Sequence, residues 1–320
     1  MKQYLLIDIG GTFIKYSLAD EQARKISGGK VPTPLTNMDD LLAAIEGFAA
    51  PLQGQFVGCA ISMPGRIDTR NGIAHTGGML SAFMWEQPFA AQVEARLGVP
   101  VTIANDGKCA AAAEGWTGAL AGVENGLVLA LGTGGGGIIL SGKVLMGAHA
   151  AAGEVSGLVS NMAAMETETF EMNKVETFSD APLWAGAASA TGLIREYARQ
   201  KKLSLQGPLP TGEEIFAAYN AGEPEAQKAL KIFARRVAVG ILSLQNVLDV
   251  EKVAIGGGIS KQPLLLESLR SAYDGLYASR AGQAYMEGLP RCQIVPCAFS
   301  SEANQVGVAA AYFEAMQKKC

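Results

Sequence analysis

The sequence predicts an α/β protein made of two related lobes, and three observations lead to this prediction. First, an apolar run over Tyr4–Ile9 is followed by Gly10-Gly11-Thr12 and a second apolar stretch over Phe13–Leu18, an order typical of strand, tight turn and strand. Second, the same order returns in Gly126–Leu140. Third, segments with strand and helix periodicity alternate along the rest of the chain. Two related hairpins indicate two related lobes.

The remaining elements are predicted from the spacing of their apolar residues. The last helix has apolar residues at Val306, Ala310 and Phe313, so we expect it to pack back on a sheet. A polar stretch without periodicity, residues 161–180, is expected to be irregular. Helices are predicted over Asp39–Ala50, Phe89–Leu97, Ala110–Trp116, Leu183–Gln200, Gly212–Ala221, Glu225–Leu248 and Glu302–Lys318, and strands over Phe56–Ser62, Val101–Ile103, Lys252–Ile255 and Ile294–Val295.

The composition narrows the class of protein. Of 320 residues 49% are hydrophobic and 18% charged, which suffices for one large core or two moderate ones. The net charge is −4 and no basic run is longer than Lys318-Lys319, so a nucleic-acid partner is not expected. Asp8 interrupts the first apolar stretch, and no window of about 18 apolar residues lacks charge or glycine, so neither a signal peptide nor a membrane span is expected. A soluble, cytoplasmic protein is the expectation.

Cysteine and histidine are sparse. The five cysteines form no CxxC pair, which favours reduced and mostly buried thiols. The two histidines, His75 and His149, have no second histidine or cysteine at ligand spacing, so a zinc site or a histidine-centred triad is not expected. Catalysis would therefore depend on carboxylates and backbone groups.

Two glycine-rich turns could bind phosphate. Glycines leave backbone N–H groups accessible and a threonine adds a hydroxyl donor, as in Gly10-Gly11-Thr12 and in Gly132-Thr133-Gly134. Either turn alone is more often a tight turn without a ligand, but two in the same strand context favour phosphate. Neither is a P-loop, and neither has the dinucleotide-binding pattern.

Two carboxylates follow predicted strands. Asp8 ends the first strand and could hold Mg²⁺ through water, or it could cap the turn. Asn105-Asp106 lies between a strand and a helix, so either residue could be the helix N-cap. Phosphoryl transfer to a hydroxyl needs a carboxylate at a strand end that faces a cleft, and Asp106 is the best candidate for this base.

These motifs, taken together, resemble the ROK family of sugar kinases and related repressors. The similarity runs from about Gln3 to Gly307 and rests on six segments in the order of the family: LLIDIGGTFIKYSL, AISMPGRID, VTIANDGKCAAAAEGW, ALGTGGGGIIL, GAHAAAGE and VAIGGGIS. The resemblance implies an actin-like ATPase fold with two ribonuclease-H-like lobes, ATP and a sugar between them, and a homodimer. The expected lobes are residues 1–120 with 303–320, and residues 121–302.

The resemblance also implies roles for single residues. Asp106 matches the catalytic base, which also contacts the sugar. Asp8 matches a residue that holds Mg²⁺ through water. The implied phosphate contacts are Asp8, Gly10, Gly11, Thr12, Gly132, Thr133 and Gly134; the nucleoside contacts are Gly256, Gly257 and Gly258; the sugar contacts are Asn105, Asp106, Glu154 and Gly65.

The sequence departs from the family on the sugar side. Many members carry a histidine shortly after the glutamate that Glu154 matches, and then a cysteine-rich zinc loop; here Gly157 takes the place of the histidine, and no cysteine lies between Cys109 and Cys292. We therefore expect no structural zinc and an acceptor bulkier than a free hexose, resembling the zinc-free β-glucoside kinase branch. The expected reaction is phosphorylation of a hydroxyl of a β-glucoside, disaccharide or hexose, with the 6-OH as the candidate hydroxyl.

Several alternatives remain open at this point. The acceptor could be a free hexose, as in a glucokinase or an N-acetylmannosamine-type kinase. A sensor without catalysis would be expected to lose Asp106 or a phosphate-loop glycine, and all are present. A repressor would need a helix-turn-helix before the first motif. An acyl or other phosphotransferase on the same fold, whose substrate carries a carboxylate, would need an arginine near the motifs to bind it, and Arg66 is the candidate.

Overall fold

The computed structural model describes residues 2–132, 135–162, 183–279, 283–284 and 288–317. The chain forms two compact units, which are Met1–Ala121 with Lys143–Gly153 and Ser301–Cys320, and Gly122–Gly142 with Glu154–Ser300. The first unit therefore contains a short segment, residues 143–153, that the sequence-based division assigned to the second lobe. That segment is held by α3 in the first unit, since Lys108 Nζ donates to the Ala150 carbonyl at 3.1 Å.

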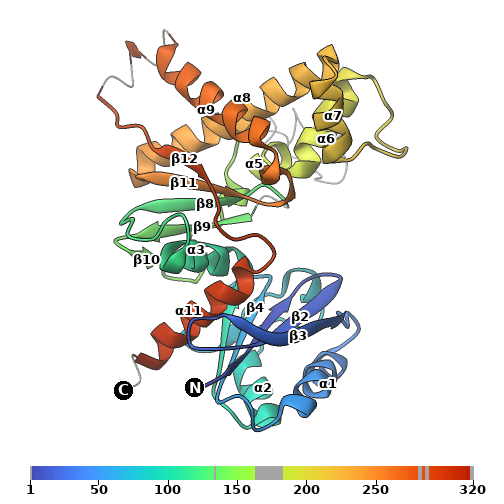
Figure 1. Ribbon diagram of the computed structural model, residues 1–320, viewed down its shortest axis with the longest axis vertical. Helices are drawn as coiled ribbons and strands as arrows, with labels where there is room; N and C mark the ends of the chain where they lie inside the picture. Colours follow the sequence, from blue (N-terminus) through green and yellow to red (C-terminus); the bar gives the residue numbers. More distant parts are fainter. Residues whose placement is uncertain (1, 133–134, 163–182, 280–282, 285–287, 318–320) are drawn as a thin grey trace. The chain divides into compact units, whose positions relative to one another are not determined.

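A five-stranded sheet forms the centre of the first unit, with the order β3-β2-β1-β4-β7 (Figure 1). β1 pairs antiparallel with β2 and parallel with β4, and β4 pairs parallel with β7. Parallel strands end at the same edge of a sheet, so residues that follow β1, β4 and β7 gather at one edge. The strands are β1 (Tyr4–Ile9), β2 (Phe13–Ala19), β3 (Lys25–Pro32), β4 (Cys59–Met63) and β7 (Val101–Asn105).

Helices cover both faces of this sheet. Because side chains alternate along a strand, Leu5, Ile7 and Ile9 pack into one buried cluster, while Tyr4 and Leu6 pack into another. The first cluster lies under α1 (Met38–Ala49) and α2 (Phe89–Leu97), and the second lies under α3 (Asp106–Thr117) and α11 (Ala303–Gln317).

The closing helix packs on the first sheet as expected, but not with the expected residues. α11 contacts α3, β1, β4 and β7. Its buried residues are Gly307, Val308, Ala309 and Tyr312, whereas the predicted Val306, Ala310 and Phe313 are only partly buried. The reason is the close approach to α3, where a Cβ on Gly307 would collide with the Cys109 carbonyl. A glycine therefore lies at the centre of the buried face.

A long excursion separates β4 from α2 in the first unit. It contains the short strands β5 (Ile67–Asp68) and β6 (Ile73–Ala74), which pair antiparallel, and the 3-10 turn η2 (Gly78–Leu80). Two backbone hydrogen bonds, from Ala74 N to Gln87 O at 2.8 Å and from Gln87 N to Ala74 O at 2.9 Å, close its base.

A second five-stranded sheet repeats this plan with the order β10-β9-β8-β11-β12, and its strands β9, β8, β11 and β12 belong to the second unit. β8 pairs antiparallel with β9 and parallel with β11, and β11 pairs parallel with β12, so β8 has the same neighbours as β1 in the first sheet. The repeated hairpin of the sequence therefore lies at equivalent places in two sheets. The strands are β8 (Gly126–Ala130), β9 (Gly135–Leu140), β10 (Lys143–Val144), β11 (Lys252–Gly256) and β12 (Gln293–Pro296).

Helices of the second unit differ from the predictions in two places. The predicted helix over Leu183–Gln200 is interrupted, because Ser189 leaves the helical conformation and its side chain accepts a hydrogen bond from Gly192 N as an N-cap. A further helix, α9, lies beside α8 (Figure 1). The helices are α5 (Trp184–Ala187), α6 (Ala190–Gln200), α7 (Gly212–Asn220), α8 (Pro224–Leu248) and α9 (Pro263–Ala278).

Within the described residues, the helices are all too short or too polar to cross a membrane.

Candidate active site

Asp8 lies next to the end of β1, on the face of the sheet that α11 covers. It is only 6% exposed, and it stands opposite Lys15 on β2 and Ser62 on β4. Asn304 of α11 donates from Nδ2 to Asp8 Oδ1 at 2.9 Å. Lys15 Nζ lies 3.8 Å from Asp8 Oδ2. The carboxylate is therefore fixed by one amide, with one cation beside it.

Burial has the largest effect on the pKa of Asp8. Removal of the carboxylate from water raises its pKa above the ordinary value of 3.8, although the hydrogen bond from Asn304 and the charge of Lys15 both act in the opposite direction. A buried carboxylate of this kind gains from a cation brought close to it.

The turn after β1 presents backbone groups next to Asp8. Gly10 N donates to Phe13 O at 3.1 Å and the Thr33 hydroxyl donates to Gly10 O at 2.7 Å, so both polar groups of Gly10 are used. Among the described residues, no partner is assigned to the N–H groups of Gly11 and Thr12 or to the Thr12 hydroxyl. These are donors of the type that a phosphate oxygen accepts.

Asn105 and Asp106 lie at the junction of β7 and α3, and the structure decides which of them caps the helix. Asn105 is the N-cap, since its Oδ1 accepts from Lys108 N at 3.0 Å. Asp106 is the first helical residue, and its Oδ1 accepts from Gly107 N at 2.8 Å and from Asn105 Nδ2 at 3.1 Å. The carboxylate is thus held at the positive end of the helix, partly exposed, while Asn105 is buried.

Gly65 lies beside this pair because Asn105 Nδ2 also donates to the Gly65 carbonyl, at 2.9 Å. The backbone at Gly65 has φ of 104°, a conformation that favours glycine, and a Cβ there would collide with the Thr76 carbonyl. The structure therefore brings together Gly65, Asn105 and Asp106, three of the predicted sugar contacts.

The second unit brings its own predicted glycines together. Leu131 N donates to Gly256 O at 2.9 Å, and a Cβ on Gly257, where φ is 96°, would lie 2.8 Å from Gly132 N. The turn after β8 and the turn after β11 are therefore in direct backbone contact. Gly258 begins the 3-10 turn η5 (Gly258–Lys261). Thr133 and Gly134 lie outside the described residues.

Glu154 and Gly157 flank the 3-10 turn η3 (Val155–Gly157) in the second unit. Glu154 is its N-cap residue and is exposed. Among the described residues, no atom lies within 4 Å of the position that a Cβ on Gly157 would take. Residues 163–182, which include most of the segment that replaces the zinc loop, lie outside the described residues.

Several residues around the site were not assigned a role from the sequence. Asn304, on α11, is the amide partner of Asp8, and Lys108 is a buried lysine two residues after Asp106 that reaches the Ala150 carbonyl. Lys15, on β2, brings its ammonium group within 3.8 Å of the Asp8 carboxylate. His75 forms a hydrogen bond with Glu86. Hydrophobic periodicity carries no signal for polar contacts of this kind.

Magnesium fits the donor set of the first unit. Mg²⁺ usually takes one or two carboxylates, with waters and substrate phosphates filling the other positions. Asp8 supplies one buried carboxylate beside the Gly11 and Thr12 amides, which suits binding through water. Within the described part of the chain, no three His, Cys, Asp or Glu side chains are grouped as a metal cage.

The architecture defines the class first: two α/β units, each with a glycine-tipped hairpin beside parallel strands, form an actin-like ATPase fold. Its solved relatives include a ROK family glucokinase from Streptomyces griseus in complex with glucose and AMPPNP, with a TM-score of 0.74 and 25% identity over 96% of this chain and 98% of that chain. The fold class predicted from the sequence is confirmed.

The family follows from the sequence comparisons. The model of the ROK family matches residues 4–315, so this chain belongs to the ROK family. A β-glucoside kinase from Klebsiella pneumoniae is 31% identical over 267 residues, which is 82% of this chain and 84% of that protein. An N-acetyl-D-glucosamine kinase from Vibrio atlanticus is 29% identical over 283 residues, 83% of this chain and 87% of that protein. The family resemblance seen in the motifs is confirmed.

Proposed function

We propose that this protein is an ATP-dependent sugar kinase that transfers the γ-phosphate of ATP to a hydroxyl of a hexose or hexoside. The observation that carries the proposal is the geometry of Asp106. One oxygen of its carboxylate is held by Asn105 Nδ2 and Gly107 N, and the buried Asn105 is in turn bonded to Gly65. This is a positioned carboxylate at the end of a parallel strand, where a general base for a hydroxyl acceptor is expected.

In the proposed reaction the residues of the chain mostly position the acceptor and ATP and neutralise the charge of the phosphates. Asp106 accepts the proton of the acceptor hydroxyl as the hydroxyl oxygen bonds to the γ-phosphorus and the bond to the β-phosphate oxygen of ATP breaks. Asn105 and the carbonyl of Gly65 orient the acceptor, with Glu154 as a further contact. The amides of Gly11 and Thr12 bind phosphate oxygens.

The remaining roles concern the nucleotide. Asp8 would hold Mg²⁺ through water, and the ion when bound neutralises charge on the phosphates. We assign phosphate contacts also to Gly132, Thr133 and Gly134, and the nucleoside to Gly256, Gly257 and Gly258. The contact between the two turns of the second unit supports this assignment, because it places backbone groups of both at one edge of the sheet.

The finer part of the proposal is the acceptor. We propose a β-glucoside or a disaccharide, because Gly157 leaves open the space that a larger side chain would fill, and because the Klebsiella pneumoniae relative is named a β-glucoside kinase. The hexose and N-acetylhexosamine kinases among the relatives make a free sugar the second candidate.

A coupled assay of ADP release tests the proposal. Mg-ATP is combined with glucose, N-acetylglucosamine, N-acetylmannosamine, cellobiose and phenyl β-glucoside, and wild type is compared with Asp106→Asn. The amide keeps the hydrogen bond from Gly107 but cannot take a proton, so kcat should fall about 10²–10⁴-fold with little change in the affinity for sugar. Undiminished turnover in this variant would exclude Asp106 as the base.

A further inference from the structure

The excursion between β4 and α2 touches the candidate active site at two points. Its first residues include Gly65, whose carbonyl accepts from Asn105. Its turn η2 carries Met79, whose thioether lies where a Cβ of Gly11 would be. The loop His75–Glu86, which we call the 75–86 loop, is thus anchored next to both the base and the first phosphate-binding turn.

The 75–86 loop exposes two large apolar side chains beside the site. Trp85 is 61% exposed and Met79 58% exposed. Single exposed apolar residues are ordinary, but two within seven residues next to a polar site are less so. The backbone around Trp85 is held: Gln87 Nε2 donates to Trp85 O at 3.1 Å, and the bridge between Ala74 and Gln87 closes the loop. The indole is therefore presented to solvent by a fixed backbone.

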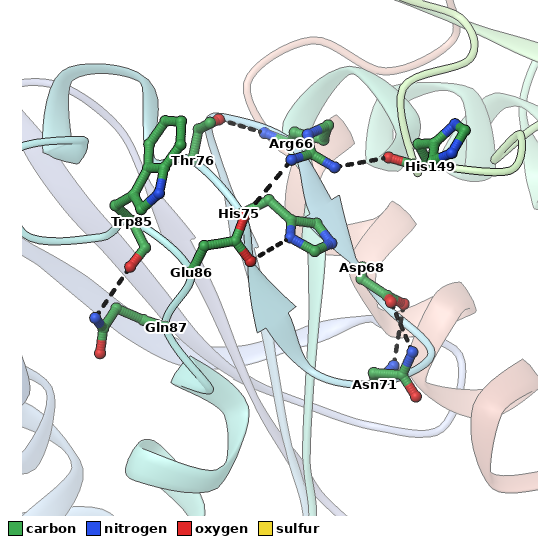
Figure 2. A network of polar contacts seen from close by, with 9 residues as sticks. All are labelled: Arg66, Asp68, Asn71, His75, Thr76, Trp85, Glu86, Gln87 and His149. Carbon is green, nitrogen blue, oxygen red and sulfur yellow. Dashed lines mark hydrogen bonds and ion pairs between the residues drawn. The ribbon is translucent and has the colours of Figure 1, made fainter.

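Beside Trp85 three charged or titratable side chains converge (Figure 2). His75 Nδ1 lies 2.7 Å from Glu86 Oε2, and an Arg66 nitrogen lies 3.7 Å from the other Glu86 oxygen. Arg66 also donates to the His149 carbonyl at 3.2 Å. In Figure 2 the side chains of Arg66, His75 and Glu86 point toward one another, while the indole of Trp85 projects away from them.

The backbone at Glu86 has an uncommon conformation. Glu86 has φ of 51°, a left-handed conformation that is uncommon for residues other than glycine. In Figure 2 the side chains of Trp85 and Glu86, neighbours in sequence, point in different directions. Such strained residues are concentrated at ligand sites.

We propose that Trp85, together with Arg66, His75 and Glu86, forms a subsite for the non-reacting end of a glycoside acceptor, that is, its second sugar ring or its aryl group. The inference rests on the proposed kinase function and names the acceptor class. An indole face packs on the apolar face of a sugar ring or on an aryl ring, and the charged groups beside it hydrogen-bond ring hydroxyls.

The charge of the cluster identifies the kind of ligand. The positive charge of Arg66 is offset by Glu86, which also binds His75. An anionic group such as a sugar phosphate would meet Glu86 as well as Arg66, so the cluster offers little net attraction for an anion. A neutral ring with hydroxyl groups, which can both donate and accept, suits such a mixed set of donors and acceptors.

The test measures steady-state kinetics of the full-length protein with phenyl β-glucoside, cellobiose and glucose, for wild type, Trp85→Ala and Trp85→Phe. Val57→Ala, an exposed apolar residue before β4, is the control. Trp85→Ala should raise KM for both glycosides about 10-fold, with kcat unchanged and with glucose kinetics as in wild type. Trp85→Phe keeps a ring and should restore most of the affinity. Val57→Ala should behave as wild type.

Calorimetric binding of phenyl β-glucoside to wild type and Trp85→Ala separates failure of the subsite from failure of the kinase proposal. If wild type phosphorylates no sugar, the kinase proposal fails, but a selective loss of glycoside affinity in Trp85→Ala still supports the subsite. An equal loss for glucose and glycosides, no change in Trp85→Ala, or wild type that binds the glycoside no better than glucose would each overturn the subsite.

Discussion

Asn304 Nδ2 donates a 2.9 Å hydrogen bond to Asp8 Oδ1, which joins the last helix of the chain to its first strand at the candidate magnesium site. The two residues are 296 positions apart in sequence. The next residue along α11, Gln305, also reaches the first sheet, but it donates to the Leu6 carbonyl at 3.3 Å and accepts from the Ser17 hydroxyl at 3.2 Å. Of these two neighbouring amides on α11, only Asn304 therefore contacts a residue of the candidate site, while Gln305 contacts the sheet away from Asp8.

Replacement of Asn304 should impair the enzyme more than replacement of Gln305. Asn304→Ala removes the donor that orients Asp8, and loss of a partner that positions a metal-binding carboxylate typically costs about 10–100-fold in metal affinity or activity. Gln305→Ala removes a similarly placed amide that does not touch Asp8, so kcat/KM should stay close to wild type. Titration of activity with Mg²⁺ for both variants measures the difference. An equal effect of the two changes would show that Asn304 acts only through helix packing.

Asp8→Asn should lose activity and gain stability at neutral pH. Because burial raises the pKa of Asp8, the folded state holds the proton more tightly than the unfolded state. Asp8 therefore lowers the free energy of unfolding progressively as pH rises from 3.8, the ordinary pKa of aspartate, through its raised pKa in the folded state. Above the folded-state pKa this loss of stability has reached its full size. The amide avoids this cost, so the stability advantage of the variant should be present at pH 7 and should shrink as pH falls toward 3.8.

Urea unfolding at a series of pH values measures this advantage. Thermal unfolding with Mg-ADP supplies a second readout, since a ligand that binds only the folded state raises Tm. Mg-ADP should raise Tm less in the variant than in wild type. A variant less stable than wild type at pH 7 would show that the attraction of the charged carboxylate for Lys15 and for the Asn304 amide outweighs the desolvation of Asp8.

Much of the fold and the glycine turns could be predicted because their signals are local. A glycine turn between two apolar runs predicts a hairpin wherever it occurs, and the hairpins after Tyr4 and Gly126 are both present. β3 was missed because Lys25–Pro32 is exposed along most of its length and has no apolar alternation. α9 was missed although its Pro263 at N1 and its buried Leu265, Leu269 and Tyr273 at intervals of four provide a signal.

The environment of the candidate site could not be predicted in the same way. Asp8, Asn105 and Asp106 stand out because they lie at or just after the ends of strands, which is visible in the sequence. The partners of Asp8 and Asn105 do not stand out, because Asn304 and the Gly65 carbonyl reach them through the fold and no local pattern marks a long-range hydrogen bond. The role of Glu86 as partner of both Arg66 and His75 is hidden for the same reason.

Gly65→Ala should destabilise the first unit and disturb the orientation of Asn105. A left-handed backbone costs alanine about 1–2 kcal/mol, and the collision with the Thr76 carbonyl adds to this cost. Gly54→Ala is the matched control, since Gly54 also has positive φ, 79°, but its Cβ would meet no atom within 4 Å. Urea unfolding should show a larger loss at Gly65 than at Gly54, and KM for the acceptor should rise only at Gly65. Equal losses of unfolding free energy for Gly65→Ala and Gly54→Ala would mean that the backbone at Thr76 moves away from the new Cβ without an energetic cost.

Gly157→His should change acceptor preference without affecting the fold. Within the part of the chain that the structure describes, a Cβ at this position meets no atom within 4 Å, and the residue is exposed, so the change in the free energy of unfolding should stay within about 0.5 kcal/mol. An imidazole at this point adds a hydrogen-bonding group and fills space next to Glu154. We expect kcat/KM for cellobiose and phenyl β-glucoside to fall relative to glucose, because the larger acceptors use the space that glycine leaves open. Gly157→Ala keeps most of that space and should retain the wild-type ratio of glycoside to glucose activity. If Gly157→His keeps the wild-type ratio of glycoside to glucose activity, the residue at position 157 does not determine which size of acceptor the enzyme prefers.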